Sequence, residues 1–303
     1  MRSLVTGGAG FIASHLIPEL LKRGEVVVLD DFSSGKRERL AGLEVALVEG
    51  DVADPAIAAR AVEGVETVFH LAANPSVVAS MSNPMATGHA NDMGTISILD
   101  AARRASVRSC VFTSSCAVYG GGEPPCVETM AIDPMSPYAA SKLAGEAYMM
   151  SAARSYGMRA VSVRLFNVFG PGQDPDGEYA AVIPKFIQRL QAGSGITIFG
   201  DGSQTRDFIH VSDVVRGLLA ASQVDATPPG PINLGSGVAV SLLDLVRVLG
   251  EIAGERVEPQ FAAARTGEVL HSRADIRAAQ RWLGWQPRVS LADGLRGMVG
   301  SAV

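Results

Sequence analysis

Three side chains in the middle of the chain have the types and the spacing of a proton-transfer site. Tyr138 and Lys142 stand four positions apart in the stretch Tyr-Ala-Ala-Ser-Lys, so a helix would place the phenol and the ammonium group on one face. The positive charge is expected to lower the pKa of the phenol. Tyr138 could then accept a proton from a hydroxyl group that Ser115 holds by a hydrogen bond. A Tyr and a Lys at this spacing are also frequent on ordinary surface helices, which leaves a non-catalytic interpretation open.

A glycine-rich loop near the N-terminus predicts a binding site for a dinucleotide. The sequence TGGAGFIA at 6–13 follows a short apolar run and opens a helical stretch. Small residues there let the backbone approach a pyrophosphate, and the N-terminus of the helix attracts its charge. Asp30 and Asp31 end the next apolar run, about twenty residues further on, where a carboxylate can bind ribose hydroxyl groups. A simple strand-to-helix turn would not explain these carboxylates.

Asp30 also indicates which cofactor binds. A carboxylate beside the ribose repels the additional 2′-phosphate of NADP, so the sequence predicts NAD. Lys36 and Arg37 follow closely and could instead pair with such a phosphate, but an ordinary surface position is favoured for both.

The segments around these residues predict an α/β fold with a doubly wound parallel (Rossmann) sheet. Short apolar runs alternate with helical stretches and predict strands at 4–6, 26–30, 45–50, 67–73 and 110–115. The runs are apolar throughout, as expected for parallel strands that helices cover on both faces. Apolar residues at helical spacing predict a helix over 91–105.

The second half of the chain predicts a smaller C-terminal substrate-binding lobe. Gly and Pro interrupt this half, between helices predicted over 211–222 and 241–253. We therefore predict an NAD-binding domain over 1–170, to which 211–235 returns, and a second lobe formed mainly by 171–303.

Composition excludes several other classes. The formal net charge is −5 and the 26 Lys and Arg residues are scattered, which argues against nucleic acid or a membrane as partner. The few cysteines predict no disulfide framework and a cytoplasmic location. No signal peptide is expected before the glycine loop, and no apolar run approaches about 18 residues. No metal site is predicted, because metal-ligand spacing is lacking among His70, His210, His271, Cys110, Cys116 and Cys126.

The order of these motifs resembles a known family. The glycine loop, the acidic strand end, HLAA at 70–73, Asn91, FTSSCAVYG at 112–120 and SPYAASK at 136–142 follow one another as in the extended short-chain dehydrogenase/reductases. The pattern is most similar to the NAD-dependent nucleotide-sugar epimerases and dehydratases, over essentially the whole chain. The resemblance implies NAD as cofactor, a UDP-sugar as substrate and a homodimer.

Positions that match the family's motifs take their roles from this resemblance. The catalytic residues would be Ser115, Tyr138 and Lys142, with Cys116 as a further candidate. The cofactor-binding residues would be Gly7, Gly10, Phe11, Ile12, Asp30, Asp31, Ser34, Gly35, Asp51, Val52, Leu71, Ala72, Ala73, Tyr138, Lys142 and Phe166. The substrate-binding residues would be Ser76, Asn167, Val182, Phe199, Arg206, Arg265 and Glu268. Ala13 stands where the family usually has a third glycine.

Some of these substrate positions have simpler explanations. The resemblance implies that Phe199 lies near the base and that Arg206 and Arg265 pair with the diphosphate. From the residues alone, core packing of Phe199 and solvated salt bridges of the arginines would be favoured.

The residues after Ser115 bear on which reaction follows oxidation at C4 of the sugar. Sugar 4,6-dehydratases carry Asp-Glu there as acid and base, whereas this chain has Cys116 and Ala117. Cys116 could serve an elimination as a proton donor or a thiolate base, or could be a small buried apolar residue. Its place resembles the UDP-N-acetylglucosamine 5,6-dehydratases of tunicamycin biosynthesis, an antibiotic pathway. That lyase activity is the first expectation.

Two alternatives to this dehydratase stay open. A UDP-glucose or UDP-N-acetylglucosamine 4-epimerase would need little beyond the three catalytic side chains. A more remote alternative is a sensor that binds NAD without catalysis, although such proteins usually lack the Tyr and Lys pair.

A dimer interface is expected on two helices, the one after Asn91 and the one that carries Tyr138. Tyr148, Met149 and Met150 would supply its apolar surface. The alternative is that these side chains pack within the subunit.

Overall fold

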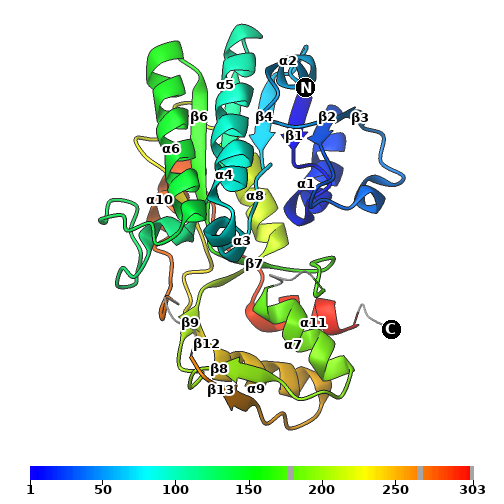
Figure 1. The fold of residues 1–303 in the computed structure, drawn as a ribbon, viewed down its shortest axis with the longest axis vertical. Coiled ribbons are helices and arrows are strands. Elements are labelled where there is room, and N and C mark those ends of the chain that lie inside the picture. Colours follow the sequence, from blue (N-terminus) through cyan, green and yellow to red (C-terminus); the bar gives the residue numbers. More distant parts are fainter. Residues whose placement is uncertain (177–180, 265–268, 301–303) are drawn as a thin grey trace.

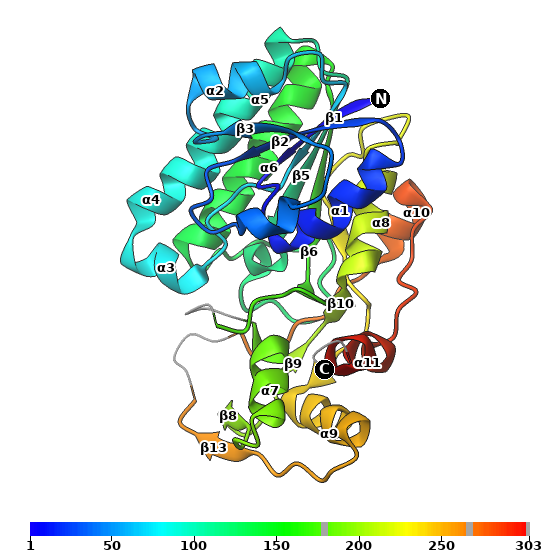
Figure 2. The same ribbon diagram turned by 90° about the vertical axis from the view of Figure 1, so that its right-hand side faces the viewer.

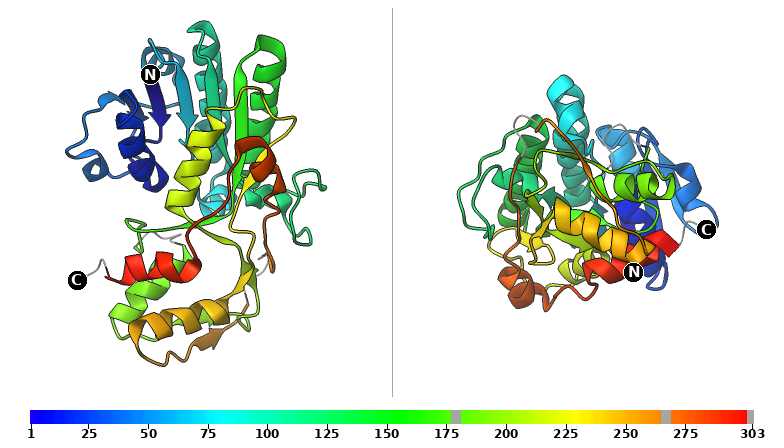
Figure 3. Two further views of the ribbon diagram at one scale, coloured as in Figure 1. Left: turned by 180° about the vertical axis from the view of Figure 1, so that it is seen from behind. Right: turned by 90° about the horizontal axis from the view of Figure 1, so that it is seen from below.

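The computed structural model describes residues 1–176, 181–264 and 269–300, which form two lobes of unequal size. Figure 1 shows the larger lobe, which is built on a sheet and contains the N-terminus, above a smaller lobe that contains the last helix. The view from behind in Figure 3 shows the same two parts.

The larger lobe contains a seven-stranded sheet in which all neighbouring strands are parallel. In spatial order its strands are β11 (Ile232–Leu234), β6 (Arg159–Leu165), β5 (Ser109–Ser115), β4 (Thr67–His70), β1 (Arg2–Thr6), β2 (Glu25–Asp30) and β3 (Ala46–Glu49). The chain runs outward from β1 to β3 and then returns to β4 on the other side of β1. This reversal defines a doubly wound sheet, and its carboxyl edge there is where such folds bind nucleotides. The predicted fold class is confirmed.

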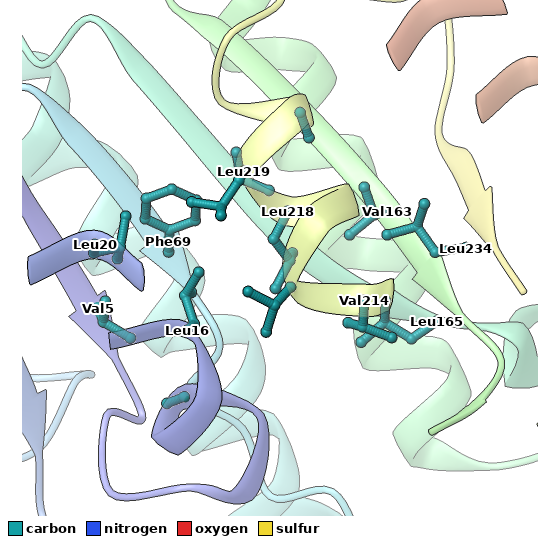
Figure 4. Close-up of a cluster of buried hydrophobic side chains, with 14 of the residues drawn as sticks. Val5, Leu16, Leu20, Phe69, Val163, Leu165, Val214, Leu218, Leu219 and Leu234 are labelled. Atoms are coloured by element: carbon teal, nitrogen blue, oxygen red, sulfur yellow. The ribbon is translucent and has the colours of Figure 1, made fainter. Parts of the chain in front are cut away.

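Helices cover both faces of this sheet (Figure 2). One face carries α2 (Pro55–Ala61), α5 (Gly94–Arg104) and α6 (Pro137–Tyr156), and the other carries α1 (Phe11–Leu21), α8 (Val211–Ala221) and α10 (Arg277–Leu283). Figure 4 shows the second face, where Leu16 of α1, Leu218 of α8 and Phe69 of β4 belong to one buried cluster. Because α8 and β11 come from the stretch 211–235, that stretch packs into the larger lobe.

Two local predictions differ from the structure. β3 is mostly exposed rather than covered on both faces, because it is the edge strand of the sheet. The helix predicted over 91–105 begins only at Gly94, after the short η2 (His89–Met93), which is a π-helical turn. Such a turn inserts an extra residue into the helical repeat and is frequent at functional sites.

The smaller lobe is built from three pairs of short strands and three helices. The pairs are β7 (Asn167–Phe169) with β10 (Phe208–His210), β8 (Thr197–Phe199) with β13 (Gln260–Ala262), and β9 (Thr205–Arg206) with β12 (Val240–Ser241). The helices α7 (Val182–Gln191), α9 (Leu242–Ala253) and α11 (Leu291–Gly300) pack on one apolar cluster with these strands. The lobe therefore has a hydrophobic core of its own.

Candidate active site

The glycine-rich loop joins β1 to α1 and fits a pyrophosphate. Gly7 has a left-handed backbone, with φ of +67°, and a Cβ atom there would lie 2.8 Å from the backbone of Ala72, so only glycine allows this approach. Gly10 precedes α1 without a side-chain cap, which leaves the first N–H groups of the helix available to an anion. Ala13, in place of the third glycine, buries its methyl group in the core. The predicted Phe11 and Ile12 lie in the half-buried first turn of α1.

Asp30, at the end of β2, holds the loop in place. Its Oδ2 accepts a hydrogen bond from the Ala9 amide at 2.9 Å, and its Oδ1 accepts one from the Phe32 amide at 2.8 Å. Each carboxylate oxygen can accept a further bond, so Asp30 is still able to bind a ribose hydroxyl group. The other residues predicted for this corner follow it along the same turn: Asp31, Ser34 and Gly35.

The two cations near Asp30 pair with carboxylates of the protein. Lys36 Nζ lies 2.5 Å from Asp174, and Arg37 Nη2 lies 2.6 Å from Glu49. The side chains of Lys36 and Arg37 are exposed, as ordinary surface residues are. Their position gives no reason to expect a 2′-phosphate site.

The start of the smaller lobe is tied to the glycine-rich loop by residues that sequence reasoning did not select. Arg39 donates hydrogen bonds to the carbonyl oxygens of Ala9 and Gly172, at 3.1 and 3.0 Å. His15 lies with its Nε2 2.9 Å from the carbonyl oxygen of Pro171. Because these bonds go to backbone oxygens, no pattern of side-chain types could have revealed them.

The residues predicted to contact the adenine follow β3, and those predicted for the inner half of the cofactor, with the predicted substrate contact Ser76, follow β4. Asp51 accepts a hydrogen bond from His89 at 2.8 Å. Burial opposes ionisation of Asp51, but the Ala53 amide and His89 outweigh it and lower its pKa. Val52 is buried. The remaining predicted residues follow β4 in half-buried positions: Leu71, Ala72, Ala73 and Ser76, the last as the N-cap of α3 (Val77–Ser82).

Ser115 and Tyr138 meet where β5 ends and α6 begins. Ser115 is the last residue of β5, and Tyr138 is the second residue of α6. Burial outweighs the Ser115 side chain, which favours ionisation of the phenol, and raises the pKa of Tyr138 to about 12. The expected lowering of this pKa by the lysine is therefore not seen in the protein alone, because loss of solvent around the phenol is the larger effect.

Lys142 lies one turn further along α6 and is buried. Its Nζ donates a hydrogen bond to the carbonyl oxygen of Thr113 at 2.9 Å and lies 5.8 Å from the centre of the Tyr138 ring. Burial lowers the pKa of Lys142 to about 8, and the charge of Asp92 opposes this shift. The structure thus brings Ser115, Tyr138 and Lys142 together on one side of α6.

A buried ion pair fixes α6 against the sheet. Arg164 of β6 forms two hydrogen bonds with Glu146 of α6, at 2.8 and 2.7 Å, and Ser114 of β5 donates a third to Glu146 at 2.5 Å. Glu146 follows Lys142 by one helical turn. At Gly145 a Cβ atom would lie 2.3 Å from the Phe112 ring, so glycine lets the helix lie directly on β5.

Cys116 begins the short η3 (Cys116–Tyr119) directly after Ser115. It packs, half-buried, against an apolar cluster that includes Cys126 and Phe166, and its charge would act on Tyr138. Burial raises the pKa of its thiol to about 12. The thiol is therefore protonated near neutral pH, as the phenol of Tyr138 is, so of the two roles considered for Cys116 the raised pKa fits a proton donor better than a thiolate base.

A cavity of about 520 Å³ lies in the smaller lobe, next to the end of β7. Four predicted substrate residues line it: Asn167, Val182, Phe199 and Arg206. Arg265 and Glu268 lie outside the described residues. Phe166 does not line it, because its ring is buried beside Tyr119. A depression of about 600 Å³ along α9 contains none of the predicted residues.

The predicted dimer surface is only partly available. Tyr148 is 39% exposed, whereas Met149 is 1% exposed and packs in the core of its own subunit. Successive residues of a helix point about 100° apart, so the two cannot face the same partner. The homodimer stays a prediction.

The histidines considered as ligands have other partners. His70 lies between two threonine hydroxyl groups, His210 contacts Ser212, and His271 contacts Thr205. In the part of the chain that the structure describes, no three His, Cys, Asp or Glu side chains gather as metal ligands. No helix of that part is long and apolar enough to cross a membrane.

Replacing Asp92 by Asn should shift the pH dependence of catalysis. The Asp92 carboxylate raises the pKa of Lys142, and without it the pKa should fall further below its present value of about 8. Lys142 would then lose its proton at lower pH, so the alkaline limb of kcat/KM should move to lower pH. The pH–rate profile measures this, with Asp100→Asn on the exposed side of α5 as control. Superimposable profiles for wild type and Asp92→Asn would contradict it.

The comparisons with known proteins agree with this geometry. The model of the NAD dependent epimerase/dehydratase family matches residues 3–235. The chain is 41% identical to a UDP-glucose 4-epimerase of Mycolicibacterium smegmatis, with 97% of this chain and 96% of that protein covered.

Two solved structures are similar over nearly the whole chain. A UDP-glucose 4-epimerase of Thermotoga maritima with UDP-glucose has a TM-score of 0.94 at 37% identity, and the match covers 99% of this chain and 98% of that one. A UDP-glucose 4-epimerase of Thermus thermophilus in complex with NAD has a TM-score of 0.91 at 36% identity, with both chains fully covered. These relatives favour the 4-epimerase alternative over the 5,6-dehydratase that was the first expectation.

Proposed function

This chain belongs to the NAD dependent epimerase/dehydratase family, and from that premise we propose that it is a 4-epimerase of a UDP-hexose, either UDP-glucose or UDP-N-acetylglucosamine. Full-length similarity to UDP-glucose 4-epimerases carries the proposal. The site supports it, because Ser115, Tyr138 and Lys142 lie at the carboxyl edge of the sheet.

The proposed reaction divides its tasks among the three catalytic side chains. NAD, when bound, supplies a hydride acceptor and a positive charge, and the glycine-rich loop and Asp30 would hold it. Tyr138 takes the proton of the C4 hydroxyl as the C4 hydride departs. Ser115 hydrogen-bonds that hydroxyl, and charged Lys142 favours the phenolate form of Tyr138. Once the keto sugar has rotated in the site, Tyr138 gives its proton back to the C4 oxygen, and the reduced cofactor would supply the hydride to the opposite face of C4.

Cys116 is the position at which a dehydratase, but not an epimerase, would need an additional acid–base group. Elimination of water requires a second acid and base near C5 and C6, whereas inversion at C4 requires none. Ala117, which offers no base where 4,6-dehydratases carry Glu, and the packing of Cys116 against an apolar cluster support the simpler reaction.

Replacing Cys116 by Ser should therefore leave epimerase kcat within about threefold of wild type, because loss of a true acid–base group would cost at least about a hundredfold. Serine keeps the size of the side chain and removes its thiol. Initial-rate kinetics with the UDP-hexose substrate measure the effect. A hundredfold loss of kcat at unchanged KM would show that the thiol takes part in the chemistry.

The product identifies the reaction. The protein is incubated with NAD and either UDP-glucose or UDP-N-acetylglucosamine, and the products are followed by proton NMR and mass spectrometry. We expect the C4 epimer at unchanged mass. Loss of one water would restore the dehydratase interpretation, and absence of turnover with both sugars would reject the epimerase.

A further inference from the structure

A buried chain of hydrogen bonds runs from the glycine-rich loop through His70 to the π-turn before α5. Thr6 Oγ1 lies 2.7 Å from His70 Nδ1, and His70 Nε2 lies 3.0 Å from Thr95 Oγ1. All three side chains are at most 1% exposed. Water therefore cannot replace either partner in these hydrogen bonds.

The outer partners, Asn91 and Ala72, determine which atom donates and which accepts in each of these hydrogen bonds. Thr95 Oγ1 donates its one hydrogen to the carbonyl oxygen of Asn91 at 2.6 Å, so towards His70 it can only accept, and Nε2 must carry a proton. At the other end, Thr6 Oγ1 accepts from the Ala72 amide at 3.1 Å and donates to Nδ1. His70 is therefore neutral, with its proton on Nε2.

The cationic form of His70 does not fit this arrangement. A proton on Nδ1 would face the hydroxyl hydrogen of Thr6, which would lose its acceptor. Burial and the charge of Lys142 lower the pKa of His70 to about 3. One tautomer thus satisfies all of these bonds.

Both ends of this series of hydrogen bonds, Ala72 and Asn91, lie next to residues proposed for cofactor binding and catalysis. Ala72 is the residue whose backbone contacts Gly7 in the cofactor loop. Asn91, in the π-turn, donates its side-chain amide to Ser141 at 2.9 Å, directly before Lys142. The Phe112 ring adds a second link, since it stacks on His70 and lies 5.1 Å from Lys142 Nζ.

We propose that His70, as a neutral Nε2–H imidazole, is a positioning residue that couples the cofactor loop to the part of α6 that carries Lys142. The test of this inference by kcat rests on the proposed function, whereas the tests by NAD affinity and by the tautomer of His70 do not. A residue that merely fills the core would need only the ring. His70 instead bonds the Thr6 hydroxyl of β1 and the Thr95 hydroxyl of α5, and through these two hydroxyls it reaches the Ala72 amide and the Asn91 carbonyl.

Kinetics of variants at His70 and at its partner Thr95 test the coupling. Thr95→Val keeps the shape but removes the hydroxyl, and His70→Phe keeps the ring but removes both bonds. Each should lower kcat about 10- to 100-fold and weaken NAD binding, while KM for the UDP-sugar stays within about threefold. Thr95→Ser should restore wild-type values. The matched control is Ser97→Ala on the same helix, because its buried hydroxyl has no hydrogen-bond partner among the described residues and its loss should change nothing.

NMR of the wild-type protein labelled with ¹⁵N-histidine tests the tautomer directly. His70 should show a proton on Nε2 only, with no titration between about pH 5 and pH 9. A proton on Nδ1, a titration in that range, or wild-type kcat and NAD affinity in Thr95→Val would overturn the proposal. If no UDP-sugar is turned over at all, the epimerase proposal fails, while NAD affinity and the tautomer still decide the role of His70.

Discussion

Replacing Tyr138 by Phe should lower kcat by about a thousandfold or more, because the phenol hydroxyl is the group that exchanges a proton with the C4 hydroxyl. The change removes one oxygen atom from a side chain at the start of α6, where Ser115 at the end of β5 acts on its ionisation. The ring remains, so KM for the UDP-sugar and the affinity for NAD should change little.

Tyr148→Phe is the matched control for this experiment. Tyr148 lies on the same helix, is exposed and has no part in the proposed chemistry, so its loss of a hydroxyl group should leave kcat unchanged. Steady-state kinetics of both variants, with NAD content measured on the same samples, separate a chemical effect from loss of cofactor. If Tyr138→Phe kept more than about a tenth of wild-type kcat, another group would have to be the base.

Replacing Arg164 by Met should destabilise the protein by about 3–5 kcal/mol, because it leaves the Glu146 carboxylate buried without its cation. The side chains of Arg164 and Glu146 are only 2% and 7% exposed. Denaturant unfolding, followed by circular dichroism, measures the free energy of unfolding. Since Glu146 follows Lys142 by one turn, residual activity should fall as well.

The exposed pair of Arg247 and Glu251 is the control for the buried one. Arg247 Nη1 lies 2.7 Å from Glu251 Oε1, as close as the paired atoms of Arg164 and Glu146, but both side chains are 61% exposed. Arg247→Met should therefore cost less than about 1 kcal/mol. Equal losses of unfolding free energy in Arg164→Met and Arg247→Met would show that burial of the Arg164 pair does not determine its contribution to stability.

Sequence reasoning recovered the features that depend on local pattern. Apolar runs that alternate with helical stretches predicted the parallel sheet, and the spacing of Tyr138 and Lys142 predicted that both lie on one face of a helix. These patterns recur because backbone geometry alone imposes them. The cofactor loop was predicted for the same reason, since Gly7 occupies a position where any side chain would strike Ala72.

Features that depend on contacts between distant segments could not be predicted in this way. The pKa of Tyr138 is set by how much solvent is lost around it, which its neighbours in sequence do not reveal. Met149 looked available to a partner subunit, but its direction on α6 sends it into the core. The π-turn at Asn91, which separates the predicted helix start from the real one, is held by the hydroxyl of Thr95.

The role of Cys116 shows the same limit. Its position beside Ser115 made it a reasonable candidate for elimination chemistry. The structure gives the thiol an environment that keeps its proton in place. The reaction proposed at C4 therefore uses Ser115, Tyr138 and Lys142 and does not require the thiol.

Transfer of the label from UDP-[4-²H]glucose tests the central claim most directly, namely that C4 is oxidised transiently and that the same hydride returns to its opposite face. The enzyme is incubated with the labelled sugar nucleotide in ordinary water, and the product is examined by NMR and mass spectrometry. We expect the C4 epimer with its deuterium still on C4 and its mass unchanged. A product that has lost the deuterium from C4, or has lost a molecule of water, would contradict the account.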